Sequence, residues 1–310
     1  MSVRLSLMLA GITVLSSALW DRPTRAEEAL TICFDENVPP YSVRHGKESG
    51  GFDVNVAEAL AGRLGRPLAV QWFESKLDWD SSSALAANAL LSDRRCQLIG
   101  GYPLVGDALG KPGAETARMP DFDGAKPEDR RRRVPLGTLV PSRPYHYAPL
   151  TIVLADSASA KPITRLADLE NMKLVVEAAT LADSILMTFG DGRLVNHITH
   201  LVPGRGELLP RLEQGGFDAT LVPLHRFDAY RAGHPDTRLR ASGYYHRIGF
   251  NMGFVGLSSE AVLLEHVNVA LGEMLAKGEL PALAQAAGMT YVPPHRPDVL
   301  ESLSLADLHE

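Results

Sequence analysis

Apolar residues along the chain follow two patterns: short continuous runs, and runs that repeat every three to four positions. The run LTICF at 30–34 predicts a buried strand, and the apolar positions after Asp53 predict an amphipathic helix that ends at Gly65. Two more strands and a helix are predicted at 68–73, 96–101 and 82–91. Strands that alternate with helices in this way are typical of an α/β fold.

A second series with the same alternation starts near residue 151. Its predicted strands are 151–155, 173–178, 198–202 and 218–224, and its predicted helices are 181–190 and 206–215. A long apolar strand at 247–257 and helices at 261–278 and 280–289 end the pattern. The chain therefore has enough elements for two lobes.

The two series predict a first lobe over 27–150, a second lobe over 151–246 and a return to the first lobe over 247–310. A chain that leaves one lobe, builds another and returns crosses the hinge twice, near 150 and 247. Ligands of open α/β sheets bind at the carboxyl ends of the strands. We therefore expect a ligand cleft between the lobes.

Residues 1–26 have the composition of a secretory signal peptide. Arg4 precedes an apolar run of about sixteen residues, shorter than the ~20 that a membrane span needs, and TRA at 24–26 places small residues at −3 and −1. We expect export to the periplasm, with an uncleaved N-terminal anchor as the alternative. The net charge of −6 becomes more negative without this segment, which argues against nucleic acid as a partner.

The stretch 103–143 interrupts the alternation, because it is rich in Gly, Pro and charged residues and has no sustained apolar period. It predicts a long loop or lid, and its run of four arginines at 130–133 predicts a solvated loop rather than a phosphate site. Cys33 and Cys96 would meet in an oxidising compartment. Both lie in apparent strands, where direct bonding between neighbours is awkward, so a disulfide and two buried thiols remain equal alternatives.

Catalytic motifs are missing from the sequence. We find no GxSxG, HExxH or Walker motif and no dinucleotide fingerprint, so we predict neither an enzyme nor a cofactor. Three histidines, His146, His225 and His246, would bind a metal or a carboxylate if all of them faced the cleft. Three separately hydrogen-bonded histidines are the favoured interpretation, and no metal site is predicted.

Several ordered motifs resemble the periplasmic extracellular solute-binding proteins of the amino-acid type, which deliver ligands to ABC transporters. The motifs are ENVPPYS at 36–42, GGFDVNVAEALAGRLG at 50–65, SRPYHYAPLTIVL at 142–154, ITRLADLENMKLVVEAAT at 163–180 and LEQGGFDATLV at 212–222. The resemblance covers nearly the whole mature chain. It implies a two-lobed fold of the type II periplasmic-binding-protein class that closes about its hinge on a small molecule, as a monomer that docks on a permease.

The two charged anchors of that family are absent here. The segment that carries its carboxylate-binding arginine is replaced by GYPLVGDALG at 101–110, and Pro223 stands where the family has an acid for the α-amino group. A zwitterion would leave both charges desolvated and unpaired, which costs several kcal/mol. The resemblance therefore implies a small polar metabolite other than a standard amino acid.

A narrower resemblance suggests an alternative partner. CFDENVPPYS at 33–42, Trp72-Phe73 and CQLIGGYP at 96–103 are similar to accessory factors of periplasmic quinoprotein alcohol (methanol) dehydrogenases. The long insertion departs from that branch. In this alternative the partner is a dehydrogenase instead of a permease.

The candidate ligand-binding residues come from the loops that face the expected cleft. They are Asp35, Asn37, Tyr41, Tyr102, Tyr145, His146, Thr180 and His225. Tyr41 matches a position where the family stacks a side chain on the ligand, although a buried structural tyrosine is a close alternative. Thr180 matches the family's Gly-Thr turn, with Ala179 in place of the glycine, and this helix start would also hold an anion. For Asp35 and Asn37, local turn capping is an equal alternative.

The letters GGFD occur twice, and we expect the two copies to do different work. In the first copy Asp53 stands where a helix N-cap belongs. In the second copy Gly215 and Gly216 end a helix, and Phe217-Asp218 lead into a strand.

Overall fold

The computed structural model describes residues 28–45, 48–74, 83–158, 160–302 and 308. The predicted signal peptide, 1–26, lies outside these residues. Within the described part of the chain, helices long and apolar enough to cross a membrane are absent.

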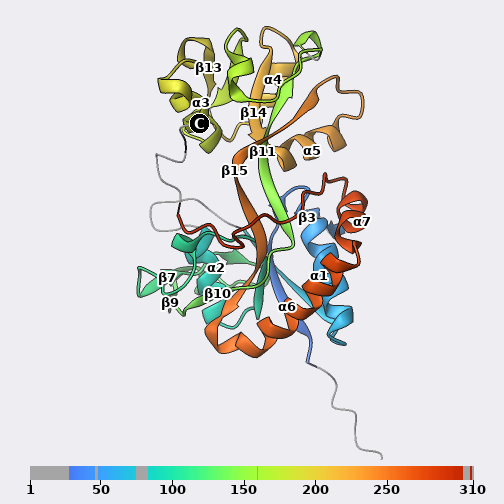
Figure 1. Ribbon diagram of the computed structural model, residues 1–310. Coiled ribbons are helices and arrows are strands. Elements are labelled where there is room, and N and C mark those ends of the chain that lie inside the picture. Colours follow the sequence, from blue (N-terminus) through green and yellow to red (C-terminus); the bar gives the residue numbers. More distant parts are fainter. Residues whose placement is uncertain (1–27, 46–47, 75–82, 159, 303–307, 309–310) are drawn as a thin grey trace, which may run out of the picture.

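A mixed sheet runs through both lobes (Figure 1). Its strand order is β13-β12-β14-β11-β15-β6-β1-β5-β8, with β10 also paired to β15. Lobe 2, drawn at the top, holds β12 (Leu174–Glu177), β13 (Ile198–Leu201) and β14 (Ala219–Pro223). Lobe 1, drawn below, holds β1 (Leu30–Asp35), β5 (Leu68–Glu74), β6 (Leu98–Pro103), β8 (Asp121–Phe122) and β10 (Leu139–Pro141).

Two long antiparallel strands, β11 (His146–Leu154) and β15 (Arg240–Leu257), join the lobes. In lobe 2, β11 pairs with β14, and in lobe 1, β15 pairs with β6. Both strands start earlier than predicted. The first part of β15 alternates exposed and half-buried residues, so it contains no continuous apolar run that would have revealed it.

Helices cover both faces of the sheet in each lobe. Lobe 1 has α1 (Phe52–Arg63), α2 (Ser83–Ser92), α6 (Ala261–Ala276) and α7 (Glu279–Ala286), and lobe 2 has α3 (Leu181–Thr188), α4 (Leu208–Glu213) and α5 (Leu224–Gly233). Separate apolar clusters lie on the two faces within each lobe. The predicted two-lobed α/β architecture with two hinge crossings is confirmed. The exact lobe boundaries stay predictions, and Leu308 packs in a lobe 2 cluster.

The insertion at 103–143 is neither a long loop nor a lid, so that expectation was wrong. It contains a two-stranded sheet of β7 (Thr116–Arg118) and β9 (Arg133–Pro135), and β8 extends the main sheet beyond β5. Met119, Phe122 and Val134 are buried in the apolar cluster of α2. These strands have three residues or fewer, too few to show a period in the sequence.

Cys33 and Cys96 form a disulfide, with Cα atoms 5.7 Å apart. Cys33 lies on β1, but Cys96 precedes β6, which starts at Leu98 instead of at residue 96. The bond therefore joins a strand to a loop, and the difficulty of linking directly paired parallel strands does not arise.

The first GGFD copy starts α1, although not as expected. The N-cap is Gly51, with φ +118°, and a Cβ there would lie 2.3 Å from the Tyr41 carbonyl oxygen. Asp53 is instead a buried first-turn residue, so its prediction as the N-cap was wrong. Next to this turn, β2 (Asn37–Val38), β3 (Ser42–His45) and β4 (Glu48–Gly50) form a small sheet.

The second copy follows the prediction. Gly215 and Gly216 both have φ +92° just after α4, and the Asp218 carboxylate accepts the Lys173 N–H before β14 begins. The expectation that the two copies do different work is confirmed.

Candidate functional site

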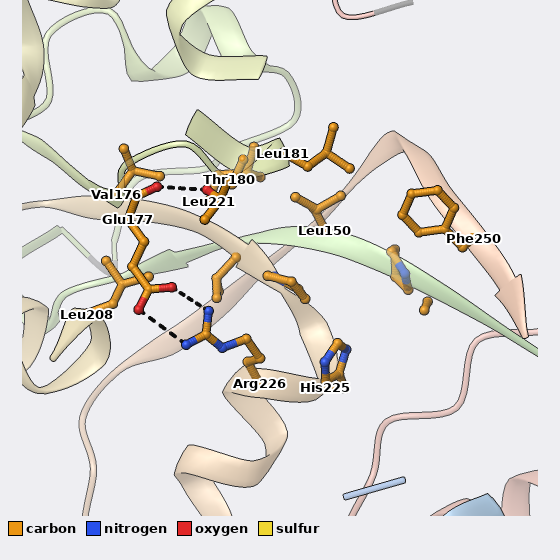
Figure 2. Close-up of a pocket in the computed structure, with 15 residues that line it drawn as sticks. Leu150, Val176, Glu177, Thr180, Leu181, Leu208, Leu221, His225, Arg226 and Phe250 are labelled. Carbon is orange, nitrogen blue, oxygen red and sulfur yellow. Dashed lines mark hydrogen bonds and ion pairs between the residues drawn. The ribbon is translucent and has the colours of Figure 1, made fainter. Parts of the chain in front are cut away.

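A cavity of about 230 Å³ lies on the lobe 2 side of the hinge (Figure 2). The carboxyl ends of β12 and β14, the first turns of α3 and α5, and the hinge strands β11 and β15 surround it. This is the place where open α/β sheets bind ligands. Pro223 lines the cavity between β14 and α5.

Most of the cavity wall is apolar. The side chains labelled in Figure 2 include Leu150, Val176, Leu181, Leu208, Leu221 and Phe250. They come from both hinge strands and from lobe 2. A wall of this composition favours apolar atoms of a ligand by roughly 25 cal/mol for each Å² removed from water.

One ion pair stands at the cavity. The Arg226 guanidinium donates to both carboxylate oxygens of Glu177, at 2.6 and 3.4 Å, and the Glu177 carboxylate is almost fully buried. The sequence analysis missed this pair. A glutamate that ends the apolar run LVVE was the available signal, because a charge at the end of a buried strand needs a partner.

The start of α3 is already capped from within the chain. The Thr180 hydroxyl accepts the Asp183 N–H at 3.2 Å and donates to the Glu177 carbonyl at 2.8 Å. The Ala179 N–H donates to the Asp183 carboxylate at 2.8 Å, and Ala179 takes a left-handed conformation with φ +57°. A carboxylate of the protein therefore occupies the turn that we expected to hold an anion.

Tyr41, His146 and His225 meet between the lobes. The Tyr41 hydroxyl lies 3.2 Å from Nε2 of His146, and the Tyr41 ring centroid lies 4.7 Å from that of His225. Tyr41 and His146 are buried, and His225, at the start of α5, also lines the cavity. Within the described residues, the Nδ1 atoms of both histidines are buried without a hydrogen bond.

Both histidines are neutral at physiological pH. Burial, and then the neighbouring His225, lower the pKa of His146 to about 3. Burial, and then Arg226, lower the pKa of His225 to about 4. Each imidazole therefore carries one N–H donor and one acceptor nitrogen.

The other candidates lie away from the cavity. The buried Tyr145 hydroxyl donates to Asp53 at 2.8 Å and accepts the Gly101 N–H at 2.9 Å, which makes it part of the lobe 1 interior. Tyr102 is buried in the α2 cluster and donates to the Ala108 carbonyl at 2.8 Å.

Asp35 and Asn37 form a local turn. The Asp35 carboxylate accepts the Asn37 N–H at 3.2 Å, and Asn37 is exposed. This contact matches the turn-capping alternative. His246 is buried on β15, where its Nδ1 accepts the Ile248 N–H at 3.0 Å. Across the described ranges, there is no group of three or more His, Cys, Asp or Glu side chains arranged to hold a metal ion.

The lobes also touch beside the cavity. The buried Asp228 carboxylate on α5 accepts the Thr290 N–H at 2.7 Å and its hydroxyl at 3.0 Å. Tyr147, Leu224 and Val292 pack together next to this contact. The cavity and this contact between the lobes therefore share residues of α5.

Comparison with known proteins places the fold. No protein-family model matches the chain, and no curated protein matches it by sequence. The L-cystine solute receptor of Neisseria gonorrhoeae, in its unliganded open form, is 18% identical with a TM-score of 0.59, covering 86% of this chain and 95% of its own. The second substrate-binding domain of a putative amino acid ABC transporter from Streptococcus pneumoniae is 15% identical with a TM-score of 0.59, covering 84% and 99%.

A histidine kinase sensor domain with similarity to periplasmic binding proteins also matches, at 15% identity and a TM-score of 0.51, covering 87% of this chain and 99% of its own. These identities show a shared fold alone. Because transport receptors and a sensor share that fold, function has to be argued from the site.

Proposed function

We propose that this protein is a periplasmic solute-binding protein that captures a small molecule between its lobes for an ABC-type uptake system. The observation that supports this most directly is the position of the cavity. It lies at the carboxyl ends of β12 and β14 and against both hinge strands, so an occupant would contact lobe 2 and the elements that set the angle between lobes.

The proposed role is binding, not catalysis. In the described cavity wall, the polar side chains are either paired with each other or neutral, and we find no nucleophile beside a general base. Pro223 at the cavity also supports the expectation that the solute is not a standard amino acid.

Native mass spectrometry of the protein purified from its exported pool tests this proposal. We expect a co-purified small molecule, and small-angle scattering should show a more compact particle when that molecule is added back. A protein without any bound molecule, whose scattering stays constant across a broad metabolite panel, would contradict solute capture. The comparisons lend no support to the dehydrogenase alternative, and a dehydrogenase found in the same native spectrum would favour it.

A further inference from the structure

We propose that the cavity accepts a neutral molecule of about ten non-hydrogen atoms, with an apolar body and one hydrogen-bonding group that pairs with the His225 imidazole. This inference rests on the proposed solute-binding function and names its ligand class. It replaces the polar metabolite expected from the sequence. The size follows from the volume: an apolar cavity of about 150 Å³ takes a benzene ring, and this one measures about 230 Å³.

An anionic group finds no suitable partner in the cavity. Arg226 is held by both carboxylate oxygens of Glu177, and the Ala179 N–H at the start of α3 is held by Asp183. A ligand carboxylate would have to displace one of these, or use the remaining Arg226 N–H groups beside the Glu177 carboxylate, whose charge already balances that of the guanidinium. Displacing Glu177 would leave an almost fully buried carboxylate without its cation, which is strongly unfavourable.

A cationic group also finds no free counter-charge in the cavity. The position that holds an acid in amino-acid binders is Pro223, which supplies neither charge nor a hydrogen-bond donor. The carboxylate at the cavity, Glu177, is already neutralised by Arg226. An ammonium group would therefore lose its hydration without gaining a counter-charge.

The His225 imidazole is an uncharged polar group of the cavity wall. It lines the cavity, it is neutral, and its buried Nδ1 has no hydrogen-bond partner among the described residues. Its ring contact with Tyr41 holds it at the boundary between the lobes. A neutral imidazole pairs with a hydroxyl, a carbonyl or an amide but cannot neutralise a charge, so it selects for one uncharged polar group.

Four probes that share a phenyl ring test the ligand class: benzyl alcohol, benzylamine, benzoate and L-phenylalanine. Binding to the full protein at pH 7.5 is measured by ligand-observed NMR, which detects weak complexes. We expect benzyl alcohol to bind at least about tenfold more tightly than the three charged probes, because each of them would desolvate an unpaired charge. Equal or tighter binding of benzoate, benzylamine or phenylalanine would overturn the inference.

His225→Phe tests the role of the imidazole while keeping a ring against Tyr41. We expect benzyl alcohol to bind roughly 2- to 10-fold more weakly, and toluene to bind unchanged. His234→Phe is the matched control, since His234 follows the same helix but stacks on Tyr230 away from the cavity. Equal losses for benzyl alcohol and toluene in His225→Phe would show that the ring acts by packing alone and would overturn the assigned contact.

Two more variants locate the binding and separate the two proposals. Ala148→Leu fills part of the cavity and should abolish binding of benzyl alcohol. Pro223→Asp restores an acid and should make benzylamine at least about tenfold tighter than in the natural protein. A charged solute that co-purifies and is lost in Ala148→Leu would overturn the ligand class and keep solute capture. A protein that binds neither the probes nor any co-purified molecule would overturn solute capture itself.

Discussion

The two lobes satisfy the polar atoms near the cleft in different ways. In lobe 1 the Tyr145 hydroxyl is bound on both sides, by the Asp53 carboxylate and the Gly101 N–H, and the Tyr41 hydroxyl reaches His146. In lobe 2 an apolar cavity opens beside the Glu177–Arg226 ion pair and the His225 imidazole, whose buried Nδ1 has no hydrogen-bond partner among the described residues. These tyrosine hydroxyls of lobe 1 are buried and hydrogen-bonded, so under the proposed function selection among ligands falls mainly to lobe 2.

The largest effect should come from removing the covalent link of lobe 1. The Cys33–Cys96 disulfide closes a loop with a sequence separation of 63 residues, and a loop of that length stabilises a protein by about 4 kcal/mol in the chain-entropy view. We expect the Cys33→Ala/Cys96→Ala variant to lose that amount in urea unfolding, while probe binding in lobe 2 survives below the transition. A loss under about 1 kcal/mol, or loss of binding in the folded variant, would show that the lobes are not distinct in this respect.

The ion pair of lobe 2 should rank second. Arg226→Met leaves the buried Glu177 carboxylate alone, which costs ~3–5 kcal/mol for a fully buried pair and about 2 kcal/mol here, because the Arg226 side chain is 40% exposed. Adding Glu177→Gln should recover most of the loss, because the unpaired charge is gone. Thermal or urea unfolding measures both. The matched control is Arg193→Met, which breaks the exposed Arg193–Glu170 pair and should leave stability unchanged.

The buried histidines and the buried Asp53 should change the free energy of unfolding in opposite directions as the pH decreases. His146 and His225 stay neutral down to pKa values of about 3 and about 4, whereas an unfolded histidine gains its proton near pH 6.5. Above pH 6.5 both histidines are neutral in the folded and the unfolded chain. Below pH 6.5 the unfolded histidines bind protons, so the free energy of unfolding falls by about 1.4 kcal/mol per pH unit for each histidine. Asp53 opposes them: burial raises its pKa to about 7, so the folded protein keeps a proton that the unfolded chain releases above about pH 4.

Between pH 6.5 and 4 the two histidines therefore outweigh Asp53 by one proton. We expect Asp53→Asn, which keeps an acceptor for Tyr145, to steepen the acid loss of stability from about 1.4 to about 2.8 kcal/mol per pH unit. Urea unfolding of both proteins at half-unit pH steps measures the difference. Other carboxylates, such as Asp168, contribute equally to the pH dependence of both proteins, so their contributions cancel in the comparison. Parallel curves would mean that Asp53 is ionised in the folded protein.

The fold was predictable because most of its main helices and strands have a regular spacing of apolar residues in the sequence. Helix α1 and strand β12 read directly from their apolar spacing. The strands of the insertion at 103–143 could not be predicted in this way. Strands of two or three residues, such as β8, depend on pairing with a partner strand and not on a local apolar pattern. The helix start at Gly51 was misassigned to Asp53, because the approach of the Tyr41 carbonyl that demands a glycine is a tertiary contact.

The site was predictable only in part. Thr180 and His225 follow strands β12 and β14, and a residue in that position reaches the cavity through topology alone. Glu177 and Arg226 are 49 positions apart, and their pairing depends on how the start of α5 lies relative to the end of β12. Tyr145 sits at the hinge as expected, but only packing shows that its hydroxyl points into lobe 1.

The smallest effect concerns how each lobe begins a helix, and it tests the comparison at a single backbone position. Lobe 1 uses a glycine where φ is +118° at Gly51, whereas lobe 2 forces Ala179 to φ +57°. A left-handed alanine costs ~1 kcal/mol or more, and a glycine in its place costs slightly less than that in unfolded-chain entropy, so Ala179→Gly should stabilise the protein by about 0.5 kcal/mol.

Ala178→Gly is the matched control: its backbone is not left-handed, so only the entropy loss remains and it should destabilise by ~0.5–1 kcal/mol. Probe binding should stay the same in Ala179→Gly, since the Ala179 N–H keeps its bond to Asp183. If both variants lose stability equally, the left-handed turn carries no strain, and the helix starts of the two lobes are equivalent despite their different residues.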